Sequence, residues 1–126
     1  MHEMGMAEAT LDMLLEVAGG SRVKRVKLRI GKYLLVVPDS FQFSFELASA
    51  GTSADGAQLQ FEETPAVLRC RQCGKEGETA AVPFLCPNCT SPDVDLVSGD
   101  EMSLEEVELE DGTTLRNRSV AAAEAL

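Results

Sequence analysis

The sequence predicts an α+β fold: a small three-stranded sheet with two helices, interrupted by an inserted cysteine-rich domain. Three observations support this. Apolar residues recur at helical spacing in two segments, they alternate with polar residues in three others, and all four cysteines lie within residues 70–89. We therefore expect a main domain over residues 1–64 and 99–111, an inserted domain over residues 65–98, and a flexible tail over residues 112–126.

The first helix and the first strand follow one another at the N-terminus. Over residues 4–18, apolar side chains recur every three or four positions with acids on the other side, and Gly19 ends the pattern. This spacing predicts an amphipathic helix. Over residues 22–30, RVKRVKLRI, apolar and basic residues alternate, which is typical of a half-buried strand.

A second helix is expected to begin at Asp39 and to end at Gly51. Asp39 and Gln42 are spaced as in a capping box, and glycine commonly follows the last turn of a helix. Three of the five phenylalanines fall in this helix. We interpret them as core residues, with exposure of one of them to a partner as the alternative; they are Phe41, Phe43 and Phe45.

Two further alternating segments predict the second and third strands. The second begins at Gln58 as QLQFEE and ends at Thr64-Pro65, and the third is SLEEVELED, after Gly99. The outer face of the third strand is as acidic as that of the first is basic. Because opposite charges stabilise cross-strand neighbours, we expect the first and third strands to lie side by side.

The inserted domain contains two CxxC pairs, CRQC and CPNC, separated by twelve residues. A tight turn brings the two sulfurs of each pair together, so Cys70, Cys73, Cys86 and Cys89 provide the four thiolates of a structural Zn²⁺ site. Such a closed site leaves no position for a substrate, and zinc is expected to hold the fold of a zinc-ribbon-like domain. Two disulfides or four unrelated thiols are the alternatives. Short strands are expected at residues 66–69 and 81–85.

The charge balance restricts the possible partners. Acidic residues outnumber basic residues by 21 to 11, for a formal net charge of −10, which weighs against nucleic acid. No apolar run is long enough for a membrane span, and acids stand where a signal peptide needs positive charge. A cytoplasmic protein is expected. No GxxxxGK phosphate-binding loop is present, so the chain is not itself expected to be a GTPase.

The only histidine is the second residue, His2. The α-amine of Met1, the backbone amide of His2 and its imidazole together close two fused chelate rings around one ion. Such nitrogen-rich, square-planar coordination suits Ni²⁺ and Cu²⁺. Glu3 adds an amide nitrogen or a carboxylate. A terminal histidine with no role is the alternative.

Several motifs together resemble the HypA/HybF family of hydrogenase nickel-incorporation proteins. They are MHE at the start, FSFE in the second helix, DGAQL before the second strand, CxxC, CPxC, and SGDEMSLEEVELED near the end. The resemblance covers residues 1 to about 111. It implies a nickel metallochaperone, with a nickel-binding α/β domain and an inserted zinc domain.

The resemblance also implies ligands at matching positions. Met1, through its amine, His2 and Glu3 match the family's nickel-binding terminus, and the four cysteines match its zinc ligands. An acidic residue before the second helix helps to bind nickel in some relatives. Asp39 is the nearest acid here, although the capping pattern gives it another role.

The leading hypothesis is a carrier, and not an enzyme, that binds Ni(II) at its N-terminus and delivers it during maturation of [NiFe]-hydrogenase. The resemblance implies a HypB-type GTPase and the hydrogenase large subunit as partners, with urease accessory proteins as a further option; the chain is expected to be a monomer or homodimer. The alternative is a zinc-ribbon protein-interaction scaffold without nickel cargo. A zinc hydrolase is disfavoured, because all four thiolates are needed to close the zinc site.

Overall fold

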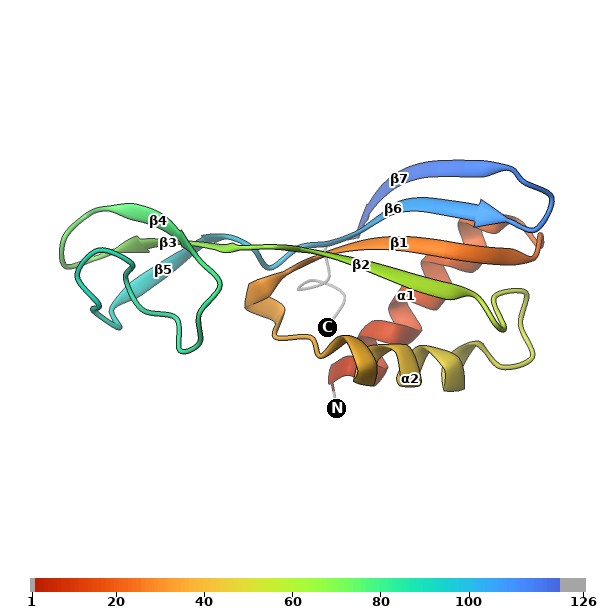
Figure 1. Cartoon of the computed structure of the whole chain (residues 1–126), viewed down its shortest axis with the longest axis horizontal. Coiled ribbons are helices and arrows are strands. Elements are labelled where there is room, and N and C mark those ends of the chain that lie inside the picture. Colours follow the sequence, from red (N-terminus) through yellow and green to blue (C-terminus); the bar gives the residue numbers. More distant parts are fainter. Residues whose placement is uncertain (1, 121–126) are drawn as a thin grey trace.

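The computed structural model describes residues 2–120, which form an elongated α+β molecule (Figure 1). No helix within these residues is long and apolar enough to cross a membrane. The elements are α1 (His2–Ala18), β1 (Val23–Gly31), a 3₁₀ turn η1 (Lys32–Leu34), α2 (Pro38–Ser49), β2 (Gln58–Thr64), β3 (Ala66–Cys70), β4 (Glu76–Thr79), β5 (Val94–Ser98), β6 (Met102–Leu109) and β7 (Thr114–Val120).

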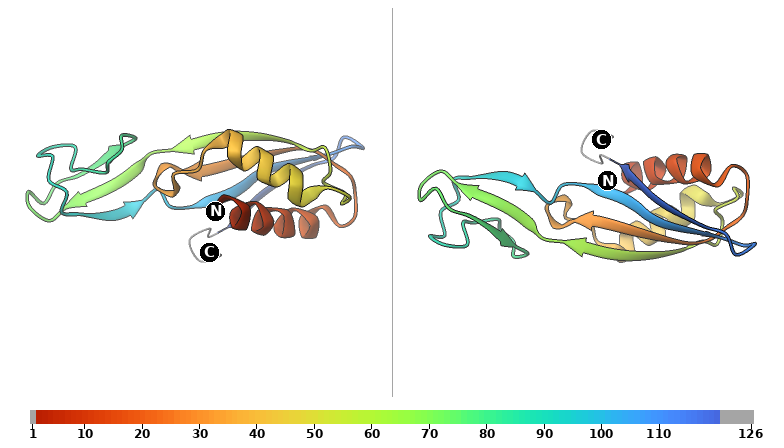
Figure 2. Two further views of the ribbon diagram at one scale, coloured as in Figure 1. Left: turned by 90° about the horizontal axis from the view of Figure 1, so that it is seen from below. Right: turned by 90° about the horizontal axis from the view of Figure 1, so that it is seen from above.

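The strands form two sheets. The larger has the order β2-β1-β6-β7, in which β1 runs parallel to β2 and antiparallel to β6. Both helices cover the same face of this sheet (Figure 2). The smaller sheet has the order β4-β3-β5 and carries the cysteines, so the chain leaves the larger sheet after β2 and returns to it at β6.

The main core lies between the helices and the larger sheet. Phe41 and Phe45 of α2 are fully buried there, as predicted, and Phe41 meets the ring of Phe61 edge-on at a centroid distance of 5.7 Å. Met6 and Leu14 of α1 complete the layer. Phe43 has 62% of its surface exposed, so the alternative of one exposed phenylalanine holds for this position.

The predicted pairing of the basic and acidic strands is confirmed. β1 and β6 are neighbours, with Arg25 opposite Glu108, and their side chains form an ion pair. Arg29 contacts Glu105 of β6 at 3.6 Å and Glu62 of β2 at 3.1 Å. Exposed pairs contribute only about 0–1 kcal/mol each, so their main effect is on strand register.

A tail was expected from residue 112, but residues 114–120 form β7, the fourth strand of the larger sheet. A tight turn at Gly112 returns the chain along β6, and the Thr113 N–H donates to Oδ1 of Asp111 (2.9 Å). Leu115 packs against the core and Arg116 pairs with Glu106 at 3.0 Å. A single inward apolar side chain is too weak a pattern to predict a strand. Residues 121–126 lie outside the described residues.

Two other expectations were wrong in detail. α2 begins at Pro38, after Val37 as the N-cap, so Asp39 lies inside the first turn and is not the cap. Proline suits this first position because it has no N–H to satisfy and its φ is already helical. Residues 81–85 form a loop, and the second strand of the small sheet is β4, at Glu76–Thr79.

The two sheets are joined at a narrow waist, where three chain segments cross. β2 continues into β3 through Pro65, and β5 continues into β6 through Gly99. A Cβ on Gly31, at the end of β1, would lie 2.0 Å from the Gly99 carbonyl oxygen. Backbone therefore packs directly on backbone at this crossing.

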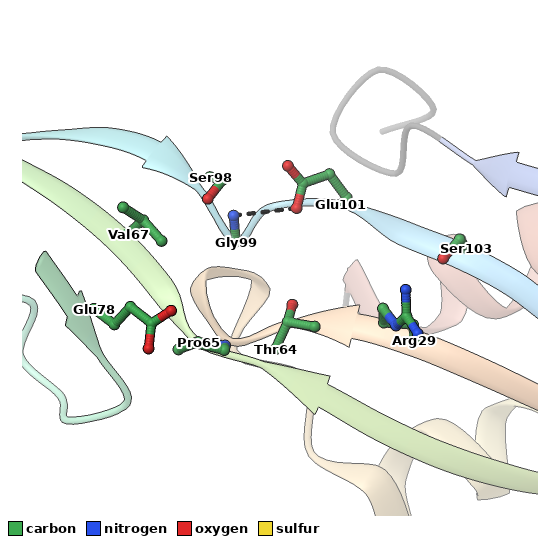
Figure 3. Close-up of a pocket in the computed structure, with 9 residues that line it drawn as sticks. All are labelled: Arg29, Thr64, Pro65, Val67, Glu78, Ser98, Gly99, Glu101 and Ser103. Carbon is green, nitrogen blue, oxygen red and sulfur yellow. Dashed lines mark hydrogen bonds between the residues drawn. The ribbon is translucent and has the colours of Figure 1, made fainter.

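An aromatic contact and an open pocket also lie at the waist. Tyr33 of η1 packs against Phe84 of the insert, with ring centroids 5.1 Å apart. The backbone N–H of Tyr33 donates to the Gly99 carbonyl at 2.9 Å. The pocket of about 440 Å³ is lined from both sheets, with Arg29 on one side and Glu78 on the other (Figure 3). These contacts place the insert against the main sheet.

Candidate metal centres

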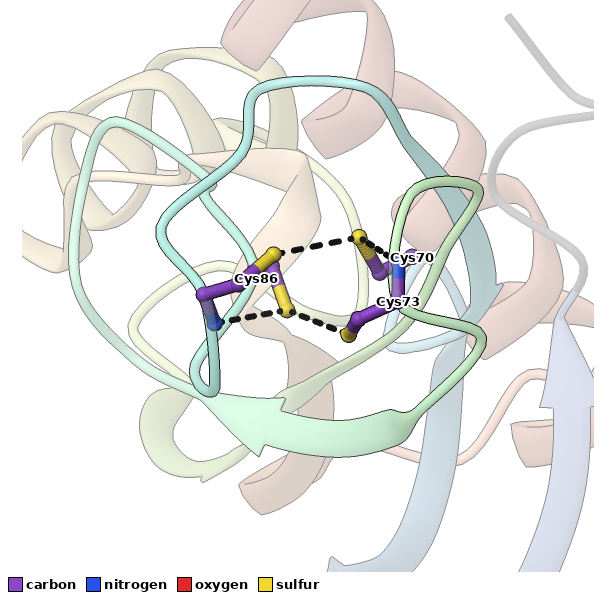
Figure 4. Close-up of side chains that lie close together, drawn as sticks. Cys70, Cys73 and Cys86 are labelled. Carbon is purple, nitrogen blue, oxygen red and sulfur yellow. Dashed lines mark hydrogen bonds between the residues drawn. The ribbon is translucent and has the colours of Figure 1, made fainter.

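The four cysteines converge at the far end of the smaller sheet (Figure 4). All four Sγ atoms lie within 4.8 Å of one another, and they are free thiols. The Sγ atoms of Cys70 and Cys89 are 3.6 Å apart, and those of Cys73 and Cys86 are 3.7 Å apart. A Zn–S bond of about 2.3 Å in a tetrahedron requires about 3.8 Å between sulfurs, so the cluster fits Zn²⁺.

Each CxxC pair forms the same turn around its first sulfur. The N–H groups of Gln72 and Cys73 donate to Cys70 Sγ, both at 3.3 Å, and the second pair repeats this arrangement around Cys86. Each turn ends in the left-handed region, at Gly74 (φ 76°) and at Thr90 (φ 63°). A threonine in this region carries a steric cost that a glycine avoids, so the second turn is the less favourable of the two.

The same N–H groups favour thiolates at the two buried sulfurs. The Cys89 N–H, with that of Asn88, lowers the pKa of the Cys86 thiol to about 6, and the Cys73 N–H lowers the pKa of Cys70. For Cys89, the Ser91 N–H favours the thiolate, but the neighbouring sulfurs outweigh it and raise its pKa to about 12. Without a cation the cluster holds some of its protons, and a metal ion must displace them.

Two polar contacts near the cluster were not predicted from the sequence. The Asn88 side chain donates to Cys73 Sγ at 3.7 Å. Arg71 pairs with Asp95 of β5 and with Asp93, which directly precedes β5. Arg71 and Asn88 each lie between the two cysteines of a CxxC pair. This position in the sequence suggests that they lie near the cluster, but it does not identify the groups that they contact.

Of the predicted nickel ligands, the structure describes the side chains of Glu3, in α1, and Asp39, in α2. Met1 and the side chain of His2 lie outside the described residues. Glu3 is in the first turn of α1, and its Oε2 accepts a hydrogen bond from the Val37 N–H at 3.1 Å. This contact joins the start of α1 to the start of α2, where the exposed Asp39 follows two residues later.

The N-cap of α2, Val37, has no side-chain oxygen that could accept a hydrogen bond from the helix. The Glu3 carboxylate of α1 acts as a cap instead, because it accepts the hydrogen bond of the Val37 N–H. We expect Glu3→Ala to lower the free energy of unfolding by about 1 kcal/mol, because it removes an acceptor and an anion from a helix N-terminus. Glu3→Gln keeps an acceptor oxygen and should lose less than half as much. Urea unfolding measures both. Glu8→Ala, on the exposed side of α1, is the control, and an equal loss there would contradict the cap.

Taken together, the fold and the cysteine cluster define an α+β metal-binding protein with a closed four-thiolate centre on an inserted sheet. The sequence model of one family, described as "Hydrogenase/urease nickel incorporation, metallochaperone, hypA", matches residues 1–109. The chain belongs to this family. It is therefore a metallochaperone of hydrogenase nickel incorporation, and not an enzyme.

Individual relatives and a solved structure agree with this assignment. The chain is 40% identical over 111 residues to the hydrogenase maturation factor HypA of Nostoc sp., covering 88% of this chain and 97% of that protein. It is 43% identical over 119 residues to that of Streptomyces avermitilis, covering 90% and 91%. The solution structure of the Ni metallochaperone HypA from Helicobacter pylori has the same fold, with a TM-score of 0.59 and 21% identity over 85% of this chain and 96% of that one.

Proposed function

We propose that this chain binds Ni(II) at its N-terminus and delivers it during maturation of [NiFe]-hydrogenase. The ligands in this proposal are the Met1 amine, the backbone amide and imidazole of His2, and the backbone amide of Glu3, with Asp39 as a nearby acid. Four nitrogens in one plane match the preference of Ni²⁺. The four cysteines hold Zn(II), which stabilises the inserted sheet.

The observation that carries this proposal is the hydrogen bond between Glu3 and Val37. It draws the first turn of α1 against the start of α2, so that Glu3 and Asp39, one acid from each helix, lie at the same end of the helical layer. It also occupies an oxygen of the Glu3 carboxylate, which favours the backbone amide of Glu3 over its side chain as the ligand.

Delivery requires that an acceptor can approach the ion. Ligands on the first residues of a chain can be exchanged one at a time by an incoming protein, whereas a closed four-thiolate site offers no open position. We therefore assign the cysteine cluster to structural zinc and the N-terminus to the nickel ion that is delivered.

The proposed partners follow from the role in hydrogenase maturation. A HypB-type GTPase and the hydrogenase large subunit are the partners for nickel transfer, and urease accessory proteins are a further candidate because the family description includes urease. Four reduced thiols require a reducing compartment, so the cytoplasm is the proposed location.

The test of this function is a calorimetric Ni²⁺ titration of the zinc-loaded, untagged protein beside its His2→Ala variant. We expect the parent to bind one nickel ion and the variant to lose at least about tenfold in affinity, because one chelate ring is lost. Equal affinity would move the nickel site away from His2. No binding by either protein would favour the zinc-ribbon interaction scaffold instead.

An extended N-terminus provides a second test that leaves every side chain in place. Adding residues before Met1 turns its amine into an amide, and we expect nickel affinity to fall as far as in His2→Ala. The same extension at the C-terminus is the matched control. Full affinity in the N-terminally extended protein would exclude the amine as a ligand.

Nickel affinity should also depend on pH. An imidazole must be neutral to bind a metal, and an unperturbed histidine has a pKa of about 6.5. The α-amine, with an ordinary pKa of about 7.7–8.0, must be unprotonated too, so affinity should begin to fall below about pH 8. Below about pH 6.5 protonation of the imidazole should steepen the fall by about a further tenfold for each pH unit. Titrations across this range measure the slope. A flat profile from neutral to mildly acidic pH would contradict ligation by His2.

A further inference from the structure

The helical side of the molecule carries acids without basic partners. α1 and α2 contain no lysine or arginine, but they contain six acids: Glu3, Glu8, Asp12, Glu16, Asp39 and Glu46. Every ion pair found within the described residues is made on the strands or next to them, and none includes an acid of either helix. Four basic residues of the larger sheet, Lys24, Arg25, Arg29 and Arg116, pair with acids of that sheet, so the two sides differ in charge.

An exposed apolar pair lies among these acids on α2. Phe43 and Leu47 are one turn apart and have 62% and 56% of their surfaces exposed, on the side of the helix opposite the buried Phe41 and Phe45. Asp39 precedes Phe43 by one turn, and Glu46 adjoins Leu47. We call Asp39, Phe43, Glu46 and Leu47 the α2 outer face. Because the buried Phe41 and Phe45 face the sheet, this face turns away from it. Figure 2 shows α2 lying against the sheet.

We propose that the α2 outer face docks a segment of a partner protein that presents lysine or arginine beside apolar side chains. Large apolar residues that a folded chain leaves together on its surface are typical of interaction sites. Phe43 and Leu47 supply the apolar anchor. The carboxylates of both helices, which have no basic partner among the described residues, supply the attraction.

The charges exclude other occupants of this face. A second copy packed through α2 would set Asp39 and Glu46 against carboxylates of the same helix in the other copy, which is destabilising. Anionic lipid and nucleic acid would be repelled in the same way. A neutral apolar surface would leave the surrounding carboxylates without partners.

The docking surface adjoins the proposed nickel terminus, because Asp39 lies two residues after Val37, which bonds Glu3. A partner seated on α2 would thus lie near Glu3 and the first turn of α1. Nickel exchange with the partner at this place rests on the proposed function. The docking of a partner on α2 does not depend on that function.

The first experiment is photo-crosslinking in the host cells, with p-benzoylphenylalanine in place of Phe43 in the full chain. The matched control places it at Lys27, on the opposite face of the sheet. We expect an adduct only from position 43, and mass spectrometry should place it in a peptide with both basic and apolar residues. Adducts to another copy of this chain, adducts to an acidic peptide, the same adducts from both positions, or no adduct would each overturn the proposal.

The second experiment measures binding of the crosslinked partner, after purification, to the parent and to Phe43→Ser and Glu46→Lys. We expect Phe43→Ser to weaken binding by about tenfold or more, as for an interface anchor, and Glu46→Lys to slow association. Gln58→Ser, on the exposed end of β2, should leave binding unchanged. Unchanged affinity in Phe43→Ser would overturn the docking proposal.

Nickel titration of the same variants separates the two proposals. Phe43→Ser should bind nickel as the parent does. If the parent binds no nickel but the partner still requires Phe43, the proposed function fails and the docking proposal holds.

Discussion

Cys86→Ser is expected to unfold the inserted sheet while the larger sheet and both helices stay folded. Within residues 2–120, the main core takes no residue from the insert. The insert itself buries only a few side chains, among them Leu68 and two of the cysteines. Zinc binding contributes about 10–16 kcal/mol to folding in small zinc domains, so its loss removes most of what holds the insert.

Nuclear magnetic resonance of the labelled variant measures this loss residue by residue. Amide signals from residues 66–98 should collapse towards random-coil values, and signals from β1 and β6 should keep their positions. Removal of zinc from the parent by a chelator should give the same spectrum. Gln72→Ala, between two ligands, is the control and should keep a folded insert. Folded signals from the insert of Cys86→Ser would contradict the structural role of the metal.

Gly31→Ala is expected to destabilise the protein strongly, although it adds a single methyl group. Gly31 has a φ of −72°, which any residue accepts, so the objection to alanine is steric. The new Cβ would lie 2.0 Å from the carbonyl oxygen and 2.2 Å from the carbonyl carbon of Gly99. Backbone cannot rotate away as a side chain can, so we expect a loss of about 3 kcal/mol in the free energy of unfolding, the upper end for overpacking.

Gly20→Ala is the comparison for Gly31→Ala. Gly20 has a φ of +92° but no heavy atom within 4 Å of the added Cβ, so only backbone strain of about 1–2 kcal/mol is expected. Urea unfolding gives both values. Gly31→Ala should also increase hydrogen exchange at Tyr33, whose N–H bonds to Gly99. A smaller loss at Gly31 than at Gly20 would mean that the waist is not packed as described.

The sequence predicts the parts of this molecule that depend on local periodicity or spacing. Alternation identified β1 and β6, and their opposite charges identified them as neighbours. The CxxC spacing predicted the cluster because two residues between cysteines leave little choice of turn. The same reasoning failed for Asp39, since a proline at the first helical position moved the cap to Val37.

Contacts between distant segments could not be predicted in this way. The bond from Val37 to Glu3 joins residues 34 positions apart, and Tyr33 meets Phe84 only because the chain crosses itself at the waist. In the part of β7 whose side chains are described, residues 114–116, Leu115 is the one apolar residue that packs on the core. The segment forms a strand because it pairs with β6. Neither composition nor spacing records such pairings.

The passage of two strands through the waist has a mechanical consequence. β2 and β6, which continue into the insert as β3 and β5, are the two immediate neighbours of β1 in the larger sheet. The insert is thus joined to the larger sheet by two chain segments that are strands on both sides of the waist, with only short connections between them. A torque applied to its tip reaches both sides of β1 as shear between hydrogen-bonded strands. Rotation of the insert relative to the larger sheet would also disturb the packing of Tyr33 on Phe84 and of Gly31 on Gly99.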